Sequence, residues 1–217
     1  MTRLLVIDTG TAATVAGVAL GADVVERRHD PAPGERPGHV AQVLVLVEAA
    51  LAAAGTELAA LERIAVGVGP GSFTGLRIGL ATARGLAHAT GLPLAGVSTL
   101  GALAVAAGDG PVLAVLDARR GEAFVARWEA GCEVAPPRAV AIADLAAAAA
   151  GATLAVGDGA VRFRAQLEPA GVAVPEDGSA LHRVGAHGLA RLAARAPIAA
   201  RDTLVPEYVR PPDARPR

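Results

Sequence analysis

The chain has 217 residues, a net charge of −1 and an aromatic content of 2%, and all 20 of its basic residues are arginine. The absence of lysine excludes a P-loop nucleotide site and a Schiff-base enzyme, and the single cysteine excludes a disulfide framework and a thiolate zinc site. Near-neutral charge and few aromatic residues argue against nucleic acid as a sole, direct partner.

A hydrophobic content of 53% raises the question of a membrane span. The longest stretch without an acidic or basic residue, 85–108, is interrupted near its middle by Gly91 and Pro93. A spanning helix needs about 20 predominantly apolar residues. The first apolar run ends at Asp8, which is too early for a signal peptide. We therefore expect a soluble, cytoplasmic protein with no membrane partner.

The first part of the chain is predicted to form strands and turns. Apolar runs at 3–8 and 14–20 are separated by the turn 9–11, and a further turn precedes Val24. This spacing predicts two consecutive antiparallel hairpins. Residues 30–38 contain three prolines and two glycines and are predicted to form a loop.

A helix predicted over residues 40–54 is apolar on nearly every side, with Gln42 and Glu48 as its only polar side chains. A surface helix normally carries a polar face. Two interpretations follow. Either the helix is enclosed within the domain, or it packs on the fold with one face and on a partner subunit with another.

A second helix, predicted over residues 75–90, carries very small side chains at every fourth position, namely Gly75, Gly79, Ala83 and Ala87. Glycine in a helix interior costs about 1 kcal/mol relative to alanine. A close approach by another backbone would compensate for that cost. The approaching backbone lies either within the domain or across an interface.

The remaining pattern alternates between strands and helices. Strands are predicted at 64–68, 92–97, 112–116, 123–128 and 154–156. Helices are predicted from Ser98 or Thr99 to residue 107, after Asp144, and over 180–195. The turn Gly108-Asp109-Gly110-Pro111 marks a boundary, and the second half repeats the hairpin, helix and strand order of the first. We therefore predict two α/β lobes, residues 1–107 and 108–217.

The densest glycine-rich segment is Gly69-Pro70-Gly71-Ser72-Phe73-Thr74-Gly75-Leu76-Arg77-Ile78-Gly79, between a predicted strand and a helix. Backbone N–H groups and the helix dipole favour an anion at such a place, and Ser72 or Thr74 can cap the helix. A tight strand-to-helix turn without a ligand would need the same glycines. Both interpretations stay open on the residues alone.

This segment strongly resembles the signature of the TsaB/YeaZ family, the small partner subunit in bacterial synthesis of threonylcarbamoyladenosine on tRNA. Individually weaker similarities follow in the family's order along nearly the whole chain. They are Asp8-Thr9-Gly10-Thr11, His39, Gly96-Val97-Ser98-Thr99-Leu100, Asp117-Ala118-Arg119-Arg120-Gly121-Glu122, Gly157-Asp158-Gly159 and Pro206-Glu207-Tyr208-Val209-Arg210.

The resemblance implies a two-lobed actin-like, Hsp70-like ATPase fold (the ASKHA fold) with reduced lobes. It implies a non-catalytic scaffold subunit that binds and activates a TsaD-type threonylcarbamoyltransferase, which modifies the adenosine next to the anticodon. A TsaE-type ATPase and a TsaC-type synthase complete the pathway. We expect a homodimer when the partner is absent, and tRNA contact only through the complex.

The resemblance also implies two groups of site residues and no catalytic residue or metal ligand. The partner interface is expected on the two first-lobe helices, at His39, Val43, Leu44, Val47, Leu51, Leu76, Gly79, Leu80, Ala83 and Ala87. Vestigial phosphate or nucleotide loops are expected at Asp8, Thr9, Gly10, Thr11, Gly71, Ser72, Thr74, Gly157 and Asp158. ATP or ADP with Mg²⁺ is expected only at the interface of the complex.

The chain departs from the family pattern in three places. Gly10 replaces a serine and so removes a hydroxyl that could bind phosphate, Val40-Ala41 replaces Ser-Glu after His39, and there is no His-x-x-x-His pair. The alternative function is a nucleotide-binding hydrolase or peptidase-like enzyme of the same fold. Its support is the glycine-rich turns with Asp8, Asp117 and Asp158.

Overall fold

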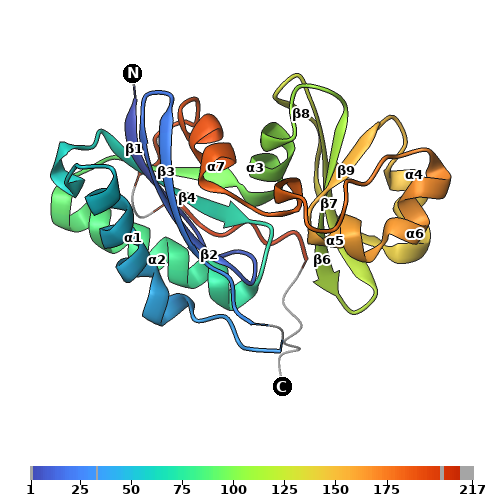
Figure 1. Cartoon of the computed structure of the whole chain (residues 1–217), viewed down its shortest axis with the longest axis horizontal. Coiled ribbons are helices and arrows are strands. Elements are labelled where there is room, and N and C mark those ends of the chain that lie inside the picture. The colour runs from blue at the N-terminus through green and yellow to red at the C-terminus, as the bar shows by residue number, and fades with distance from the viewer. Residues whose placement is uncertain (1, 33, 201–202, 211–217) are drawn as a thin grey trace.

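The computed structural model describes residues 2–32, 34–200 and 203–210, and it contains two β-sheets with helices around and between them (Figure 1). From one end to the other, the layers are a pair of helices, the first sheet, a central helix pair, the second sheet and a group of short helices. This arrangement confirms the predicted two-lobed α/β fold.

The first sheet has the strand order β3-β2-β1-β4-β5. Its strands are β1 (Arg3–Asp8), β2 (Thr14–Leu20), β3 (Asp23–His29), β4 (Arg63–Gly69) and β5 (Leu94–Ser98). The β1–β2 and β2–β3 pairs are antiparallel hairpins, as the short turns predict, whereas β4 lies parallel to both β1 and β5.

The second sheet has the order β8-β7-β6-β9, with antiparallel β6–β7 and β7–β8 pairs and a parallel β6–β9 pair. Its strands are β6 (Val112–Arg119), β7 (Glu122–Glu129), β8 (Cys132–Ala141) and β9 (Leu154–Val156). The sequence pattern did not predict β8, which contains Pro136 and Pro137. As an edge strand β8 pairs only with β7, so it tolerates the missing N–H groups.

The predicted helices are present, and several shorter ones accompany them. The α-helices are α1 (His39–Ala53), α2 (Phe73–Thr90), α3 (Thr99–Ala106), α4 (Leu145–Ala148), α5 (Asp158–Arg162), α6 (Arg164–Leu167) and α7 (Ala186–Ala193). Short 3-10 turns are η1 (Leu58–Ala60), η2 (Ile142–Asp144), η3 (Glu168–Ala170) and η4 (Ala180–His182). The helix predicted over 180–195 is therefore two pieces, η4 and α7.

Side-chain caps fix the starts of two helices that follow parallel strands. The Ser72 hydroxyl accepts a hydrogen bond from Gly75 N at 3.0 Å at the start of α2, and Ser98 does the same for Gly101 N at 3.1 Å at the start of α3. Of Ser72 and Thr74, the two caps that the sequence left open for α2, the structure uses Ser72.

The helices do not divide between the sheets as the chain order suggests. Helices α1 and α2 cover the outer face of the first sheet, and α7, from the second half of the chain, covers its inner face. Helix α3, from the first half, packs on α7 and on β6 and β7 of the second sheet. A boundary at residue 107 thus separates the two sheets but not the helices between them.

The two sheets share one hydrophobic core around α3 and α7. Leu4 and Val6 of the first sheet belong to the same buried cluster as Ala114 and Trp128 of the second. Separate clusters lie under α1 and α2 and on the outer face of the second sheet. Because the middle core is common to both sheets, we describe them as lobes of one packed unit.

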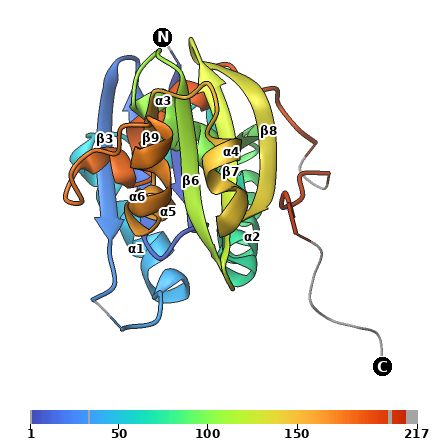
Figure 2. The same ribbon diagram turned by 90° about the vertical axis from the view of Figure 1, so that its right-hand side faces the viewer.

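The last described segment, residues 203–210, connects the two lobes on the side of α2 (Figure 2). In the first lobe, Glu207 N donates to Val68 O at 2.7 Å. In the second, Arg210 forms an ion pair with Glu122 at 2.8 Å and donates to Ala118 O at 3.3 Å. The predicted family motif at 206–210 therefore fastens the chain across both lobes.

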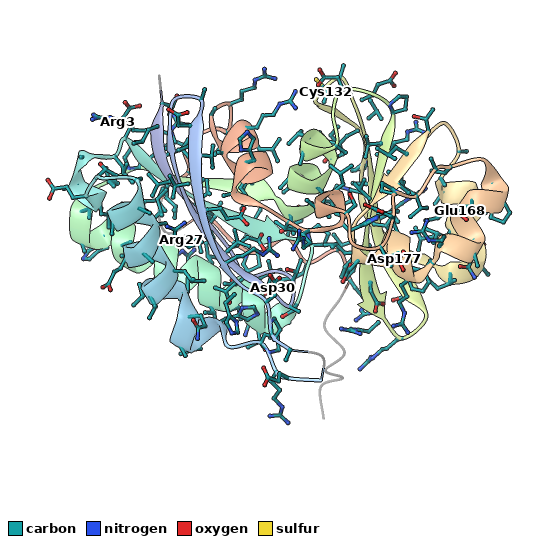
Figure 3. All side chains as sticks on the ribbon, in the orientation of Figure 1. Arg3, Arg27, Asp30, Cys132, Glu168 and Asp177 are labelled. Carbon is teal, nitrogen blue, oxygen red and sulfur yellow. The ribbon has the colours of Figure 1, made fainter. Side chains whose placement is uncertain are left out.

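Two composition-based expectations can be compared with the structure. The lone Cys132 is exposed at the start of β8 (Figure 3) and forms no disulfide. Over the described residues, we find no helix that combines the length and the apolar character needed to span a bilayer.

Candidate functional site

A cavity of about 400 Å³ lies between the lobes, where loops from both sheets meet. Its first-lobe wall is made by the β1–β2 turn and the start of α2, and its second-lobe wall by the β6–β7 hairpin and the start of α5. Side chains that line it include Thr11, Ser72, Phe73, Arg119, Asp158 and Arg210.

The predicted phosphate or nucleotide loops meet at this cavity, but only in part. Lining residues from that prediction are Gly10, Thr11, Gly71, Ser72 and Asp158. Asp8, Thr9 and Gly157 are buried behind the cavity wall, and Thr74 lies exposed on α2. The fold therefore assembles the loops while turning several of their functional groups away from the cavity.

Asp8 is the clearest case of a predicted site residue that faces inward. Its carboxylate is fully buried, accepts a hydrogen bond from Thr99 Oγ1 at 3.0 Å and one from Gly10 N at 2.9 Å. Burial raises the pKa of this carboxyl to about 6, although both hydrogen bonds lower it. The side chain joins the end of β1 to the start of α3.

The glycines of the first-lobe loops are explained by close packing. A Cβ at Gly71 would lie 2.4 Å from Gly10 O, and a Cβ at Gly75 would lie 2.0 Å from Thr9 O. The Thr9 hydroxyl in turn donates to Gly75 O at 2.7 Å. The tight strand-to-helix turn thus accounts for Gly71 and Gly75 without a ligand.

The second-lobe acids at the cavity already have partners. Asp117 forms ion pairs with Arg119 at 3.2 Å and Arg162 at 3.6 Å, and Asp158 accepts from Asp117 N at 3.1 Å. Desolvation by the surrounding walls raises the pKa of Asp158, as does the nearby Asp117 charge, whereas the charge of Arg119 lowers it. These acids shape the hairpin that carries Arg119 and Arg120.

The residues do not fit a Mg-nucleotide site of the kind that the fold family suggests. Such a site needs carboxylate oxygens directed at the metal. Here the buried carboxylate of Asp8 accepts a hydrogen bond from Thr99, and Asp117 forms ion pairs with two arginines. Gly10 offers no hydroxyl. Among the described residues, no group of three or more His, Cys, Asp or Glu side chains is arranged to hold a metal.

Most residues predicted for the partner interface are buried inside the first lobe. Those with buried side chains or backbone are His39, Val43, Val47, Leu76, Gly79, Leu80, Ala83 and Ala87. Leu51 is half-buried, and Leu44 is exposed. These residues pack α1 and α2 onto the first sheet, so only Leu44 and Leu51 of the predicted set reach the surface of the folded chain.

The stripe of small residues on α2 faces the first sheet. A Cβ at Gly79 would lie 2.3 Å from Thr9 Oγ1, so this glycine lets the helix approach the end of β1. Ala83 and Ala87 are completely buried in the cluster under α1 and α2. Of the two interpretations of this stripe, the structure supports close packing within the domain.

His39 also has an internal role at the start of α1. Its Nδ1 lies 2.8 Å from Thr14 Oγ1, and the side chain is buried. Burial lowers the pKa of this imidazole, while the Thr11 backbone raises it and the nearby His29 lowers it further. The side chain fastens the helix to β2.

The outer face of α1 is mostly apolar, and no other described residue covers it. Val40, Leu44 and Val45 are 75%, 51% and 57% exposed. The structure therefore excludes one of the two interpretations of its composition, that the helix is enclosed within the domain. The other interpretation, that one face packs on the fold and another on a partner, stays open. An uncovered apolar helix face is typical of a protein–protein contact.

An aromatic and arginine cluster beside the cavity was not predicted as a site. Phe73 and Tyr208 are 46% and 42% exposed, and Arg77 lies with its guanidinium 3.7 Å from the centre of the Phe73 ring. The chain contains only five aromatic residues, three Phe, one Trp and one Tyr. Because aromatic residues are so scarce, the presence of Phe73 in the glycine-rich segment and of Tyr208 in the 206–210 motif is the sequence signal that could have indicated this cluster.

Comparison with known proteins places these features in a family. Residues 35–191 match the family model described as TsaD: tRNA N6-adenosine threonylcarbamoyltransferase. The chain is 42% identical over 132 residues to the tRNA threonylcarbamoyladenosine biosynthesis protein TsaB of Escherichia coli, covering 58% of this chain and 55% of that protein.

An uncharacterized protein of Mycobacterium leprae is 41% identical over 138 residues, which is 63% of this chain and 38% of that relative. The matched segments thus cover 38% and 55% of the lengths of these two relatives. Among solved structures, a Pseudomonas aeruginosa protein described as similar to peptidase YEAZ has a TM-score of 0.83 and 27% identity, covering 97% of this chain and all of that one.

Proposed function

This chain belongs to the family described by the TsaD model and, within it, to the TsaB/YeaZ branch, and we propose that it serves tRNA threonylcarbamoyladenosine biosynthesis as a non-catalytic subunit. Its task is to bind and activate a TsaD-type threonylcarbamoyltransferase. The observation that carries this proposal is the exposed apolar face of α1, with Val40, Leu44 and Val45.

Two features of the interlobe cavity favour a binding subunit over an enzyme. Asp8, which ends the first strand, is held by Thr99 rather than directed into the cavity. The acids on the other wall pair with arginines or accept from the hairpin backbone. A hydrolase would need a carboxylate free to position water or metal-bound phosphate.

The same reasoning extends to the other members of the pathway. In this proposal, the α1 face pairs with a TsaD-type subunit, and two copies of the chain pair through it when that subunit is absent. A TsaE-type ATPase joins the pair, a TsaC-type synthase supplies the carbamoyl-adenylate, and tRNA contacts the chain only through the complex. ATP or ADP with Mg²⁺ then binds only at an interface of the complex.

A matched pair of substitutions on neighbouring residues of α1 tests the proposal. Leu44 is exposed and Val43 is 2% exposed in the core. We expect Leu44→Glu to abolish co-purification with a TsaD-type subunit and to leave thermal unfolding unchanged. Val43→Ala should lower stability yet retain binding at low temperature. Undiminished co-purification of the Leu44→Glu variant would refute the proposed interface.

The nucleotide-binding alternative draws on one specific observation, the cavity of about 400 Å³ with Arg119 and Arg120 in its wall. Calorimetric titration of the isolated chain with ATP and Mg²⁺ distinguishes the two functions. Tight binding that is lost in an Asp158→Asn variant would favour the enzyme. No binding by the isolated chain would favour the accessory subunit.

A further inference from the structure

A second cavity, of about 410 Å³, lies between the edge strand β3, the end of α3, η4 and α7. It shares no lining residue with the interlobe cavity. Its volume is in the range of pockets that hold small organic ligands, about 300–1,000 Å³. None of its residues belongs to the exposed face of α1, so it is independent of the proposed partner surface.

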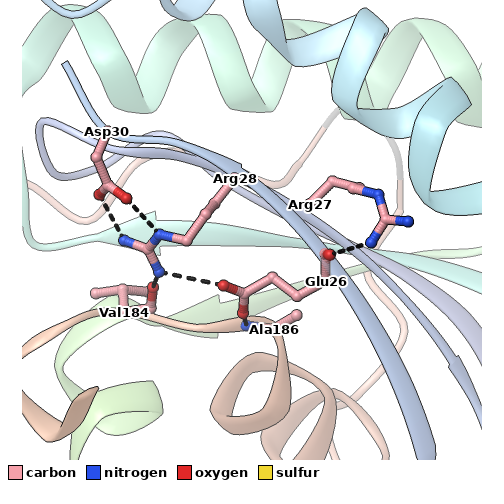
Figure 4. A network of polar contacts seen from close by, with 6 residues as sticks. All are labelled: Glu26, Arg27, Arg28, Asp30, Val184 and Ala186. Carbon is pink, nitrogen blue, oxygen red and sulfur yellow. Dashed lines mark hydrogen bonds and ion pairs between the residues drawn. The ribbon is translucent and has the colours of Figure 1, made fainter.

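One wall of this cavity is fixed by a polar network (Figure 4). Glu26 Oε2 accepts from Ala186 N at 2.6 Å, at the start of α7, and Glu26 Oε1 accepts from Arg28 Nη1 at 3.2 Å. Arg28 also donates to Val184 O at 3.3 Å and to both carboxylate oxygens of Asp30, each at 2.7 Å. Glu26, the acid of this lining, is therefore already balanced by a cation and a helix N-terminus.

The remaining charged groups of the lining are cations. Arg191 is held in place by hydrogen bonds from Nη1 to Val105 O at 2.7 Å and from Nη2 to Asp109 at 2.8 Å. The side chain of Arg183 is exposed and makes no hydrogen bond or ion pair within the described residues, and His187 adds a further basic side chain. Arg28 and Arg191 pair with Asp30 and Asp109, which lie just outside the lining, so Arg183 is the lining arginine without an ion pair among the described residues.

The floor of the cavity is apolar. Val105 and Ala106 contribute from α3, Leu181 from η4 and Gly188 from α7. A Cβ at Gly188 would lie 2.0 Å from Ala102 O, so the two helices are in close contact and the floor is firm. The cavity thus joins an apolar floor to arginine side chains, of which Arg183 has no ion pair among the described residues, a combination that is complementary to an amphipathic anion.

We propose that this cavity binds a small organic anion with an apolar body, in which Arg183 and Arg191 contact a carboxylate or phosphate group and Val105 and Leu181 contact the body. Carboxylate and phosphate match the planar donor arrangement of arginine equally well. The two chemistries are separated by experiment.

Phenyl phosphate and benzoate serve as probes, with benzyl alcohol and benzylamine as neutral and cationic matches. The full chain, labelled with ¹⁵N, is titrated with each compound and followed by NMR. We expect saturable chemical-shift changes around Leu181 and His187 with the two anions. Benzyl alcohol should bind at least tenfold more weakly, and benzylamine should not bind. The anion that binds more tightly shows whether the cavity prefers a phosphate or a carboxylate group.

Three variants locate the site. Arg183→Glu should weaken binding at least tenfold, and Ala106→Phe, which fills the cavity without changing charge, should abolish it. The control Arg138→Glu, at an exposed arginine on β8 outside both cavities, should change binding less than twofold. Circular dichroism of each variant verifies that it folds.

The proposal is overturned by any of three results. These are the absence of saturable shifts with either anion, equal affinity for benzyl alcohol and phenyl phosphate, and shifts that gather at Arg119 and Arg120 and survive Arg183→Glu. The last result would assign the anion to the interlobe cavity instead.

Discussion

The ring of Tyr208, close to the end of the described chain, stacks on the ring of Phe73 in the first turn of α2, with their centroids 5.2 Å apart and an interplanar angle of 28°. Arg77 joins the pair, because its Nε donates to the Tyr208 hydroxyl at 2.9 Å while its guanidinium covers Phe73. The stack secures the segment that connects the lobes.

Loss of the Tyr208 ring should therefore loosen this segment locally. An aromatic pair contributes about 0.5–1.5 kcal/mol beyond the area that it buries. For Tyr208→Ala, we expect roughly fivefold faster hydrogen exchange at the Glu207 amide, which donates to Val68 O. Tyr208→Phe keeps the stack and should exchange nearly as slowly as the parent. Equal protection in the alanine variant would mean that other contacts hold the segment.

Two glycines of α2 should respond to alanine in opposite directions. A Cβ at Gly79 would lie 2.3 Å from Thr9 Oγ1, whereas a Cβ at Gly85 meets nothing within 4 Å. We expect Gly79→Ala to destabilise the fold by about 1–3 kcal/mol through overpacking. Gly85→Ala should stabilise it by about 0.5–1 kcal/mol, because alanine is the better helix former.

Urea unfolding of both glycine variants measures the difference. If only helix propensity mattered, alanine would stabilise the fold at both positions. That outcome would contradict the close contact between α2 and the end of β1.

Asp8 should make stability depend on pH in the direction opposite to a salt-bridged aspartate. Its pKa is raised from 3.8 to about 6 in the folded chain, so the folded state holds the proton more tightly than the unfolded state. Stability from this group is therefore present below about pH 4 and is lost as the pH rises through about 6. The change is about 3 kcal/mol at most, at about 1.36 kcal/mol per pH unit.

Asp8→Asn removes the ionisation and should flatten this part of the pH profile. Its amide oxygen can still accept from Gly10 N, and its NH₂ group can donate to Thr99 Oγ1. Urea unfolding between about pH 4 and pH 7, compared with Asp23→Asn at the exposed start of β3, isolates the effect. Parallel profiles for the parent and Asp8→Asn would show that Asp8 carries no such coupling.

Local features of the fold were predictable because the signals for them are local. The hairpins β1–β2 and β2–β3 follow from short turns, and the starts of α2 and α3 follow from Ser72 and Ser98. The edge strand β8 was missed, since Pro136 and Pro137 suppress the strand pattern at a position where the missing donors cost nothing.

The candidate sites were harder to predict, because they depend on contacts between distant residues. The side chain of Asp8 faces inward on account of Thr99, 91 positions away. On α1, Val43 and Leu44 are adjacent and both apolar, so a helix that is apolar all round gives no sign of which side is exposed. Only the packing of the helix on the first sheet decides that Val43 is core and Leu44 is surface.

Glu26 provides the last prediction, since it joins the edge strand β3 to the start of α7. Its carboxylate accepts from Ala186 N at 2.6 Å and from Arg28, and both side chains of that ion pair are mostly buried. Glu26→Ala should lower the free energy of unfolding by about 1–3 kcal/mol, because Ala186 N is left without an acceptor.

Glu26→Gln keeps an acceptor but loses the charge that favours a helix N-terminus, a contribution of about 0.3–1 kcal/mol, so its loss of stability should be smaller. Arg27→Ala, at the exposed neighbouring position, should stay within about 0.5 kcal/mol of the parent. In urea unfolding, Glu26→Ala should thus be the least stable of the three variants, Glu26→Gln intermediate and Arg27→Ala the most stable. If the two Glu26 variants were as stable as the parent, the packing of α7 on the first sheet would be sufficient without its polar link to β3.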